Sequence, residues 1–202
     1  GNVELEYTDE GIAGGRNRVA ALGFDPALLD IAATAAWLAP RARVGVVGYC
    51  WGGTLAFLAA TRLALPAVSY YGARSRPYLD EVVRAPLMMH FGRHDPLIPQ
   101  EFHDELAARQ PAVPVHFYDA GHGFNCNERA DFHAESAALA WRRTIRFFRE
   151  HLGTTDDDAD AGDAPFVLDP RIEADTLELI DLPLCRVRLM DDARFPWLVL
   201  IP

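Results

Sequence analysis

Short apolar runs alternate with helical patterns along the first three quarters of the chain. The runs that predict β-strands, rich in Val, Tyr, Phe and Met, are 43–49, 67–72, 85–92 and 113–119. The segments whose apolar spacing predicts helices are 25–40, 52–63, 99–110 and 130–152. Since the strands are apolar on both faces and alternate with helices, we predict an α/β fold with a parallel sheet covered by helices on both faces.

An acidic segment divides the chain. Residues 153–165, "GTTDDDADAGDAP", are small and acidic without periodic apolar positions, which is typical of a linker. We therefore predict a domain at 1–152, a linker at 153–165 and a C-terminal segment at 166–202. In that segment two apolar runs around "DDAR" predict an antiparallel β-hairpin. The stretch before residue 24 shows no clear strand pattern, so we expect the first domain to be incomplete at its N-terminus.

Charge and cysteine content narrow the class of protein. The net charge is −10, but residues 154–202 hold 12 acidic and 4 basic side chains, so most of the acidity belongs to the tail. There is no basic footprint for nucleic acid, no apolar run of membrane-helix length and no signal peptide. The three scattered cysteines predict reduced thiols, and none has metal-ligand spacing. We expect a cytoplasmic protein with a small-molecule substrate, without metal or cofactor, and without nucleic-acid or membrane partners.

The segment "GYCWG" at 48–52 has the spacing of a G-x-S-x-G nucleophile turn, with cysteine in place of serine. A strand that turns sharply into a helix strains the nucleophile's backbone, and the flanking glycines avoid a collision with the turn. The helix N-terminus favours the thiolate of Cys50 and directs the N–H of Trp51 toward a developing oxyanion. In the alternative interpretation, Cys50 is a small buried hydrophobic residue in a glycine-rich turn.

Two further side chains fit as partners of Cys50. Asp95 in "FGRHDPLIP" follows the third predicted strand, and His122 in "DAGHGFN" follows the fourth. A nucleophile needs a base and the base an orienting acid, and active sites of open parallel sheets gather at these strand ends. Each residue also has a simpler interpretation: Asp95 caps the helix that follows, and His122 is a loop residue without a partner.

The motifs "GYCWGGTLAF", "FGRHDPLIP" and "YDAGHGF" resemble the nucleophile, acid and histidine motifs of the dienelactone hydrolase family. These are α/β-hydrolases with a cysteine in the triad, and the likeness runs from about residue 9 to residue 152. It implies an α/β-hydrolase-like sheet from the nucleophile strand onward, and hydrolysis of carboxylic esters or lactones by Cys50 with His122 as base and Asp95 as its partner. We add Tyr49 and Phe124 as candidate substrate contacts.

Two other functions stay open. The family's earlier strands, which carry its second oxyanion donor, have no counterpart here, so a catalytically impaired truncated or fused product is one alternative. Residues 166–202 resemble the start of a histidine-triad (HIT) domain, so a nucleotide-binding module is the other, although no histidine follows His151. Without the earlier strands, the strand that contains Val44 would be a free sheet edge, which predicts pairing with a second copy of the chain.

Overall fold

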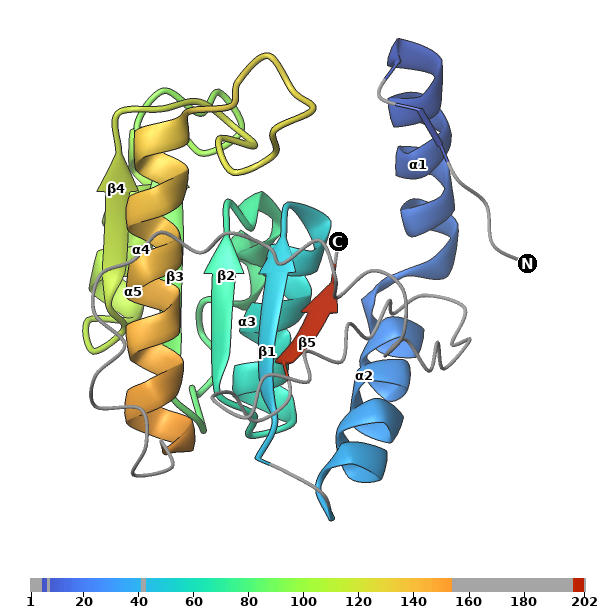
Figure 1. Cartoon of the computed structure of the whole chain (residues 1–202), viewed down its shortest axis with the longest axis vertical. Coiled ribbons are helices and arrows are strands. Elements are labelled where there is room, and N and C mark those ends of the chain that lie inside the picture. Colours follow the sequence, from blue (N-terminus) through green and yellow to red (C-terminus); the bar gives the residue numbers. More distant parts are fainter. Residues whose placement is uncertain (1–4, 7, 41–42, 154–197, 202) are drawn as a thin grey trace, which may run out of the picture.

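Five parallel strands form one sheet in the order β4-β3-β2-β1-β5. The computed structural model describes residues 5–6, 8–40, 43–153 and 198–201. The strands are β1 (Gly45–Tyr49), β2 (Ala67–Tyr70), β3 (Leu87–Gly92), β4 (Val115–Tyr118) and β5 (Leu198–Ile201). All the strands point the same way, so their carboxyl ends, and the loops that follow them, gather at one edge of the sheet (Figure 1).

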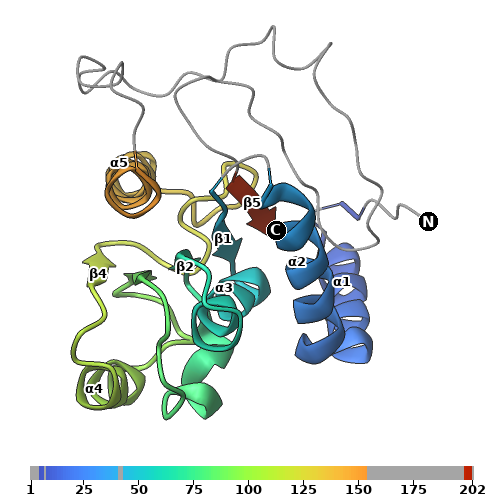
Figure 2. The same ribbon diagram turned by 90° about the horizontal axis from the view of Figure 1, so that it is seen from below.

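Helices cover both faces of this sheet. They are α1 (Asp9–Leu22), α2 (Phe24–Leu38), α3 (Trp51–Arg62), α4 (Gln100–Arg109) and α5 (Ala134–Leu152), with a short 3-10 helix η1 (Ala73–Tyr78). Seen along the strands, α5 lies on one face, α3 and α4 lie on the other, and α1 and α2 lie to the side of α3 (Figure 2). The predicted α/β architecture is confirmed, and β1 to β4 and α2 to α5 agree with the predicted ranges to within a few residues.

The hydrophobic core fills both sides of the sheet, and the part that positions the site lies between α3 and the first two strands. Val46 and Val47, which point to opposite faces of β1, are both fully buried. On α3 the small side chains of Ala56, Ala59 and Ala60 are also fully buried, so the helix can lie close to the sheet. The close packing of α3 on the sheet fixes the position of its first turn, which directly follows the candidate nucleophile Cys50.

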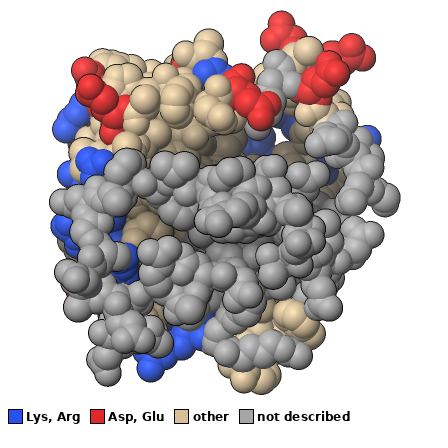
Figure 3. Space-filling view, in the orientation of Figure 1, with Lys and Arg blue, Asp and Glu red and all other residues tan. Residues whose placement is uncertain are grey.

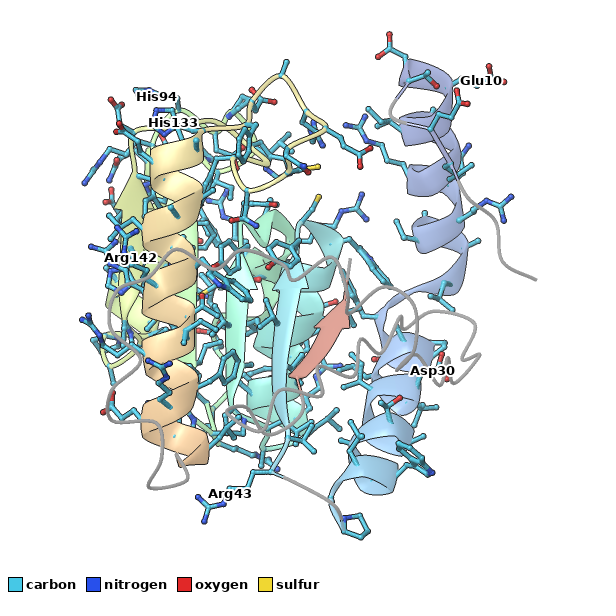
Figure 4. All side chains as sticks on the ribbon, viewed as in Figure 1. Glu10, Asp30, Arg43, His94, His133 and Arg142 are labelled. Atoms are coloured by element: carbon cyan, nitrogen blue, oxygen red, sulfur yellow. The ribbon has the colours of Figure 1, made fainter. Side chains whose placement is uncertain are left out.

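Helix α1 was not predicted. Thr8 caps it by accepting a hydrogen bond from the N–H of Gly11 at 3.1 Å, and Asp9 and Glu10 suit the positive end of the helix dipole. Acidic side chains gather over the free end of α1 in Figure 3, and Figure 4 shows Glu10 at this end. None of the helix's residues is buried, so it has no apolar stripe from which to predict it. Among the described residues no single helix is long and apolar enough to span a membrane. Only α1 and α2 taken together have the required length and composition, and they are bent by 82° at the break between them.

The expectation that β1 is a free edge of the sheet is wrong, because β5 lies beside it. It pairs with β1 in parallel, with Val46 opposite Val199, so β1 is an inner strand and is not free to pair with a second copy. The second apolar run of the predicted hairpin thus forms a parallel pair with a distant strand. The first run, the linker after Gly153 and most of the HIT-like segment lie outside the described residues.

A buried hydrogen-bond network ties α5 to the sheet through Thr144. The Thr144 hydroxyl donates to the carbonyl of Ala140 at 3.0 Å. Its oxygen lies 2.7 Å from the hydroxyl of Tyr70 and 3.2 Å from Nε2 of His90. Because its single proton is already committed to Ala140, Thr144 accepts hydrogen bonds from both Tyr70 and His90.

The same network fixes the tautomer of His90. Arg143 donates from Nη1 to the Tyr118 hydroxyl at 3.0 Å, and that hydroxyl lies 2.8 Å from Nδ1 of His90. Tyr118 therefore donates to Nδ1, and His90 carries its proton on Nε2, where it faces Thr144. Burial, with the nearby His116 and Arg143, holds the pKa of His90 well below its ordinary value, so the ring stays neutral.

The substitution Thr144→Val should lower the free energy of unfolding without changing the size of the side chain. It leaves the Tyr70 hydroxyl and His90 Nε2–H unpaired, at about 1–3 kcal/mol for each group. Urea denaturation measures the loss, with the exposed Arg142→Ala on the same helix as the control. A change within the ~0.5 kcal/mol typical of surface substitutions would contradict this role of Thr144.

Candidate active site

Cys50 occupies a sharp turn between β1 and α3. Its φ of 54° and ψ of −111° are rare for a residue with a side chain. The turn is held on both sides of the residue: the N–H of Cys50 donates to the carbonyl of Tyr70 at 3.0 Å, and its own carbonyl accepts from Gly53 at 3.1 Å. Cys50 is exposed, so the interpretation that it is a small buried hydrophobic residue is wrong.

Two glycines make this turn possible. A Cβ atom at Gly48 would lie 1.8 Å from the carbonyl oxygen of Gly52, and one at Gly53 would lie 2.4 Å from that of Tyr70. Both contacts are with backbone atoms, which cannot move aside as a flexible side chain can. The predicted requirement for glycine two residues before the nucleophile is therefore a direct steric consequence of the turn.

The structure brings Cys50, His122 and Asp95 together. Nε2 of His122 lies 3.3 Å from Sγ of Cys50, and its Nδ1 lies 2.7 Å from Oδ2 of Asp95. The other carboxylate oxygen of Asp95 accepts the N–H of Leu97 at 2.8 Å. The side chain of Asp95 is fully buried and that of His122 is 8% exposed, so both are held firmly. This is the nucleophile, base and acid arrangement expected from the sequence.

The simpler interpretations of Asp95 and His122 are both wrong. Residue Pro99 precedes α4 and no side chain caps that helix, while Asp95 faces the imidazole instead. His122 contacts both of its expected partners. The neighbouring His94 pairs with Asp119, at 2.5 Å, and both side chains are exposed. Figure 4 shows His94 near the outer end of β4, away from the turn between β1 and α3.

The electrostatics favour an ion pair between the thiol and the imidazole. Although Cys50 is exposed, the protein atoms around its sulfur displace water and would alone raise its pKa, but its hydrogen bond and charge interaction with His122, the N–H of Trp51 and the charge of Arg129 lower the pKa overall. Burial lowers the pKa of His122, but the hydrogen bonds with Asp95 and Cys50 outweigh it and raise the pKa to about 9. The negative partners on its two ring nitrogens thus stabilise the imidazolium, and the imidazolium stabilises the thiolate.

Trp51 is well placed to supply a backbone donor. It is the first residue of α3, and its N–H is one of the groups that lower the pKa of Cys50, so it lies beside the sulfur. Its indole ring stacks on Phe24, with ring centroids 5.4 Å apart and planes inclined by 16°. The start of α2 therefore helps to hold the first turn of α3 in place.

The two candidate substrate contacts differ in position. Tyr49 is half-buried beside the nucleophile, and its ring lies 4.8 Å from that of Tyr70. Phe124 is fully buried and packs against the rings of Tyr71 and Tyr118. A ring without exposed surface cannot line an open site, so Phe124 is corrected to a packing residue beneath the histidine loop.

Two residues near the nucleophile were missed from the sequence. The side chain of Arg129 packs beside Gly123, which has a φ of 78°, and its charge acts on Cys50. Tyr71 follows β2 and places its ring edge against His122. For Tyr71 the sequence offers one local feature that could have indicated a site residue, a tyrosine pair just before Gly72. The sequence around Arg129 offers no such feature. In the described ranges no group of three or more His, Cys, Asp or Glu side chains could hold a metal ion.

The substitution His122→Asn should slow alkylation of Cys50 by iodoacetamide and shift its pH profile upward. In the wild type the lowered pKa of Cys50 keeps the thiolate populated below the pH at which an ordinary thiol ionises. Without the imidazolium that advantage is lost, so alkylation should require higher pH. Mass spectrometry of the Cys50 peptide measures the rate. With the exposed His94→Asn as control, identical profiles for all three proteins would contradict the pairing.

The comparisons with known proteins agree on one family. The model of the dienelactone hydrolase family matches residues 6–152. The carboxymethylenebutenolidase of Pseudomonas sp. (strain P51) is 32% identical over 163 residues, which cover 73% of this chain and 66% of that protein. The putative carboxymethylenebutenolidase of Synechocystis sp. is 32% identical over 171 residues, 74% of this chain and 69% of that protein.

A solved structure gives the same result. The crystal structure of a putative dienelactone hydrolase from Klebsiella pneumoniae matches with a TM-score of 0.56 and 26% identity, over 65% of this chain and 64% of that chain. The chain spans from about half to about two thirds of the length of the curated relatives it matches. The family match takes in the turn at Cys50 and the loops that bear Asp95 and His122. The chain belongs to the dienelactone hydrolase family.

Proposed function

We propose that the chain hydrolyses carboxylic esters or lactones, with Cys50 as nucleophile, His122 as general base and acid, and Asp95 as the group that orients His122. The observation that carries the proposal is the continuous contact from sulfur to carboxylate. It consists of 3.3 Å from Sγ of Cys50 to Nε2 of His122 and 2.7 Å from Nδ1 of His122 to Asp95. Family membership and the named activity of the relatives agree with it.

The chemistry follows from the charges of these groups. The thiolate of Cys50 attacks the carbonyl carbon, and the N–H of Trp51 donates to the oxygen that becomes negative. The imidazolium of His122 gives its Nε2 proton to the leaving oxygen as the C–O bond breaks, which leaves an acyl thioester on Cys50. His122 then takes a proton from water, and the hydroxide so formed attacks the thioester and releases the acid and the thiolate.

The substrate class is drawn from the relatives and from one side chain. Proteins named carboxymethylenebutenolidase act on an unsaturated lactone, so we propose a lactone or small ester here. Tyr49, half-buried next to Cys50, is retained as a proposed substrate contact. Free thiols at Cys50 and Cys126 fit the reducing conditions of the cytoplasm, which we propose as its location.

The two alternatives from the sequence gain no support. The family match ends at residue 152, before the HIT-like segment begins. The comparisons favour neither a nucleotide-binding module nor a catalytically impaired product. We therefore retain a single proposed function.

The substitution Cys50→Ala should lower kcat/KM for p-nitrophenyl acetate by about 10³-fold or more, because the covalent intermediate cannot form. The release of p-nitrophenol measures the rate. The matched control is Cys185→Ala, which removes a thiol outside the family match and should keep wild-type activity. Full activity in the Cys50 variant would exclude the mechanism.

A further inference from the structure

Tyr71 has a strained backbone directly beside the candidate active site. It follows β2 with a φ of 40°, a conformation that is uncommon for an aromatic residue and that is often found at functional sites. Its N–H donates to the carbonyl of His90 at 2.7 Å, and its carbonyl accepts from Ala73 at 2.9 Å. These hydrogen bonds hold the backbone in place, so the direction of the ring is set by the fold.

The ring of Tyr71 lies against the catalytic histidine. Its centroid is 5.1 Å from that of His122, with the planes inclined by 61°. Behind it are the ring of Phe124, at 5.6 Å, and that of Tyr49, at 6.2 Å. The residue is only 3% exposed, so it forms the floor beneath the imidazole.

The hydroxyl of Tyr71 is available to a ligand. No described residue makes a hydrogen bond with it, whereas the buried hydroxyls of Tyr70 and Tyr118 are both paired. The Tyr71 oxygen is not among the fully enclosed polar atoms that lack a partner, so it keeps some accessible surface, and a ligand atom can reach it at this fixed position.

The electrostatic neighbours of this hydroxyl include the groups of the candidate active site. Burial is the largest effect and raises the pKa of Tyr71, and the thiols of Cys50 and Cys126 raise it further while Arg129 opposes them. The hydroxyl therefore lies within electrostatic range of the nucleophile and of the loop that carries His122. Since the pKa is raised, the group stays protonated and can only serve as an O–H donor or as a neutral acceptor.

We propose that Tyr71 is a further catalytic residue, whose O–H donates a hydrogen bond to the leaving oxygen of the ester or lactone bound at Cys50. This inference rests on the proposed hydrolase function. Its ring packs on His122, the group that delivers the proton to that same oxygen. The ring of Tyr71 therefore lies beside the group that protonates the leaving oxygen.

A cysteine hydrolase has a particular need for such a donor. When the tetrahedral intermediate collapses, a thiolate leaves more readily than an alkoxide, because a thiol is far more acidic than an alcohol. The intermediate therefore returns to substrate unless the leaving oxygen is stabilised. A hydrogen bond from Tyr71 lowers the charge on that oxygen while His122 transfers its proton, and the C–O bond breaks in preference to the C–S bond.

The variant Tyr71→Phe removes the hydroxyl and keeps the ring against His122. It should be assayed with the ethyl and the p-nitrophenyl ester of the same acid. We expect kcat/KM to fall about 10- to 100-fold for the ethyl ester, as for one lost hydrogen bond to developing charge. The loss for the p-nitrophenyl ester should be less than about threefold, because p-nitrophenolate leaves without help.

Tyr78→Phe serves as the matched control, since Tyr78 lies in η1 and its loss of a hydroxyl should leave both rates unchanged. Removal of an unpaired hydroxyl should also leave the stability of Tyr71→Phe unchanged or higher. Equal losses for both esters, no loss for either, or a variant that fails to fold would overturn the inference. A failure of the hydrolase proposal is separate, because Cys50→Ala would then retain activity on both esters.

Discussion

The backbone of Cys50 is the constraint on which the site depends. A φ of 54° and a ψ of −111° are unfavourable for a residue with a side chain, at a cost of about 1–3 kcal/mol. The fold meets this cost with the close approach of Gly48 to Gly52 and with α3, whose buried side chains lock it against the sheet. As a result the sulfur is exposed, and the first N–H of α3 lies beside it.

The parallel sheet supplies the partners of that sulfur. Because β1, β3 and β4 all end at the same edge, His122 and Asp95 meet Cys50 although 72 residues separate Cys50 from His122. The charges of these three groups then stabilise one another in turn. The buried carboxylate of Asp95 favours the imidazolium of His122, and that imidazolium favours the thiolate. The hydrogen bonds of α5 to the sheet, through Thr144 and His90, brace the strand ends from the opposite face.

The parts that could be predicted from the sequence depend on local signals. The glycine spacing around Cys50 reflects a steric requirement of the turn, and the order of Asp95 and His122 after apolar runs reflects the strand ends. The positions of β1 to β4 could be predicted for a similar reason, because strands that are buried on both faces require continuous apolar runs in the sequence.

The remaining features depend on tertiary contacts. The apolar run at 198–201 indicates a strand but cannot indicate that its partner is β1, some 150 residues earlier, or that the pairing is parallel. Helix α1 has no buried face, and only its capping residues marked it. Whether Phe124 contacts substrate or packs in the core depends on the path of its loop, as does the approach of Arg129 to Cys50. The free hydroxyl of Tyr71 becomes apparent only when the hydrogen bonds around it are known.

The central claim is that hydrolysis passes through an acyl group on the sulfur of Cys50. Its most direct test is mass spectrometry of the protein quenched in acid during turnover of p-nitrophenyl acetate. The account expects an acetyl group on the peptide that contains Cys50, bound as a thioester that hydroxylamine removes. Steady turnover with the acetyl group on another residue, or with no acetylated Cys50 at any quench time, would contradict it.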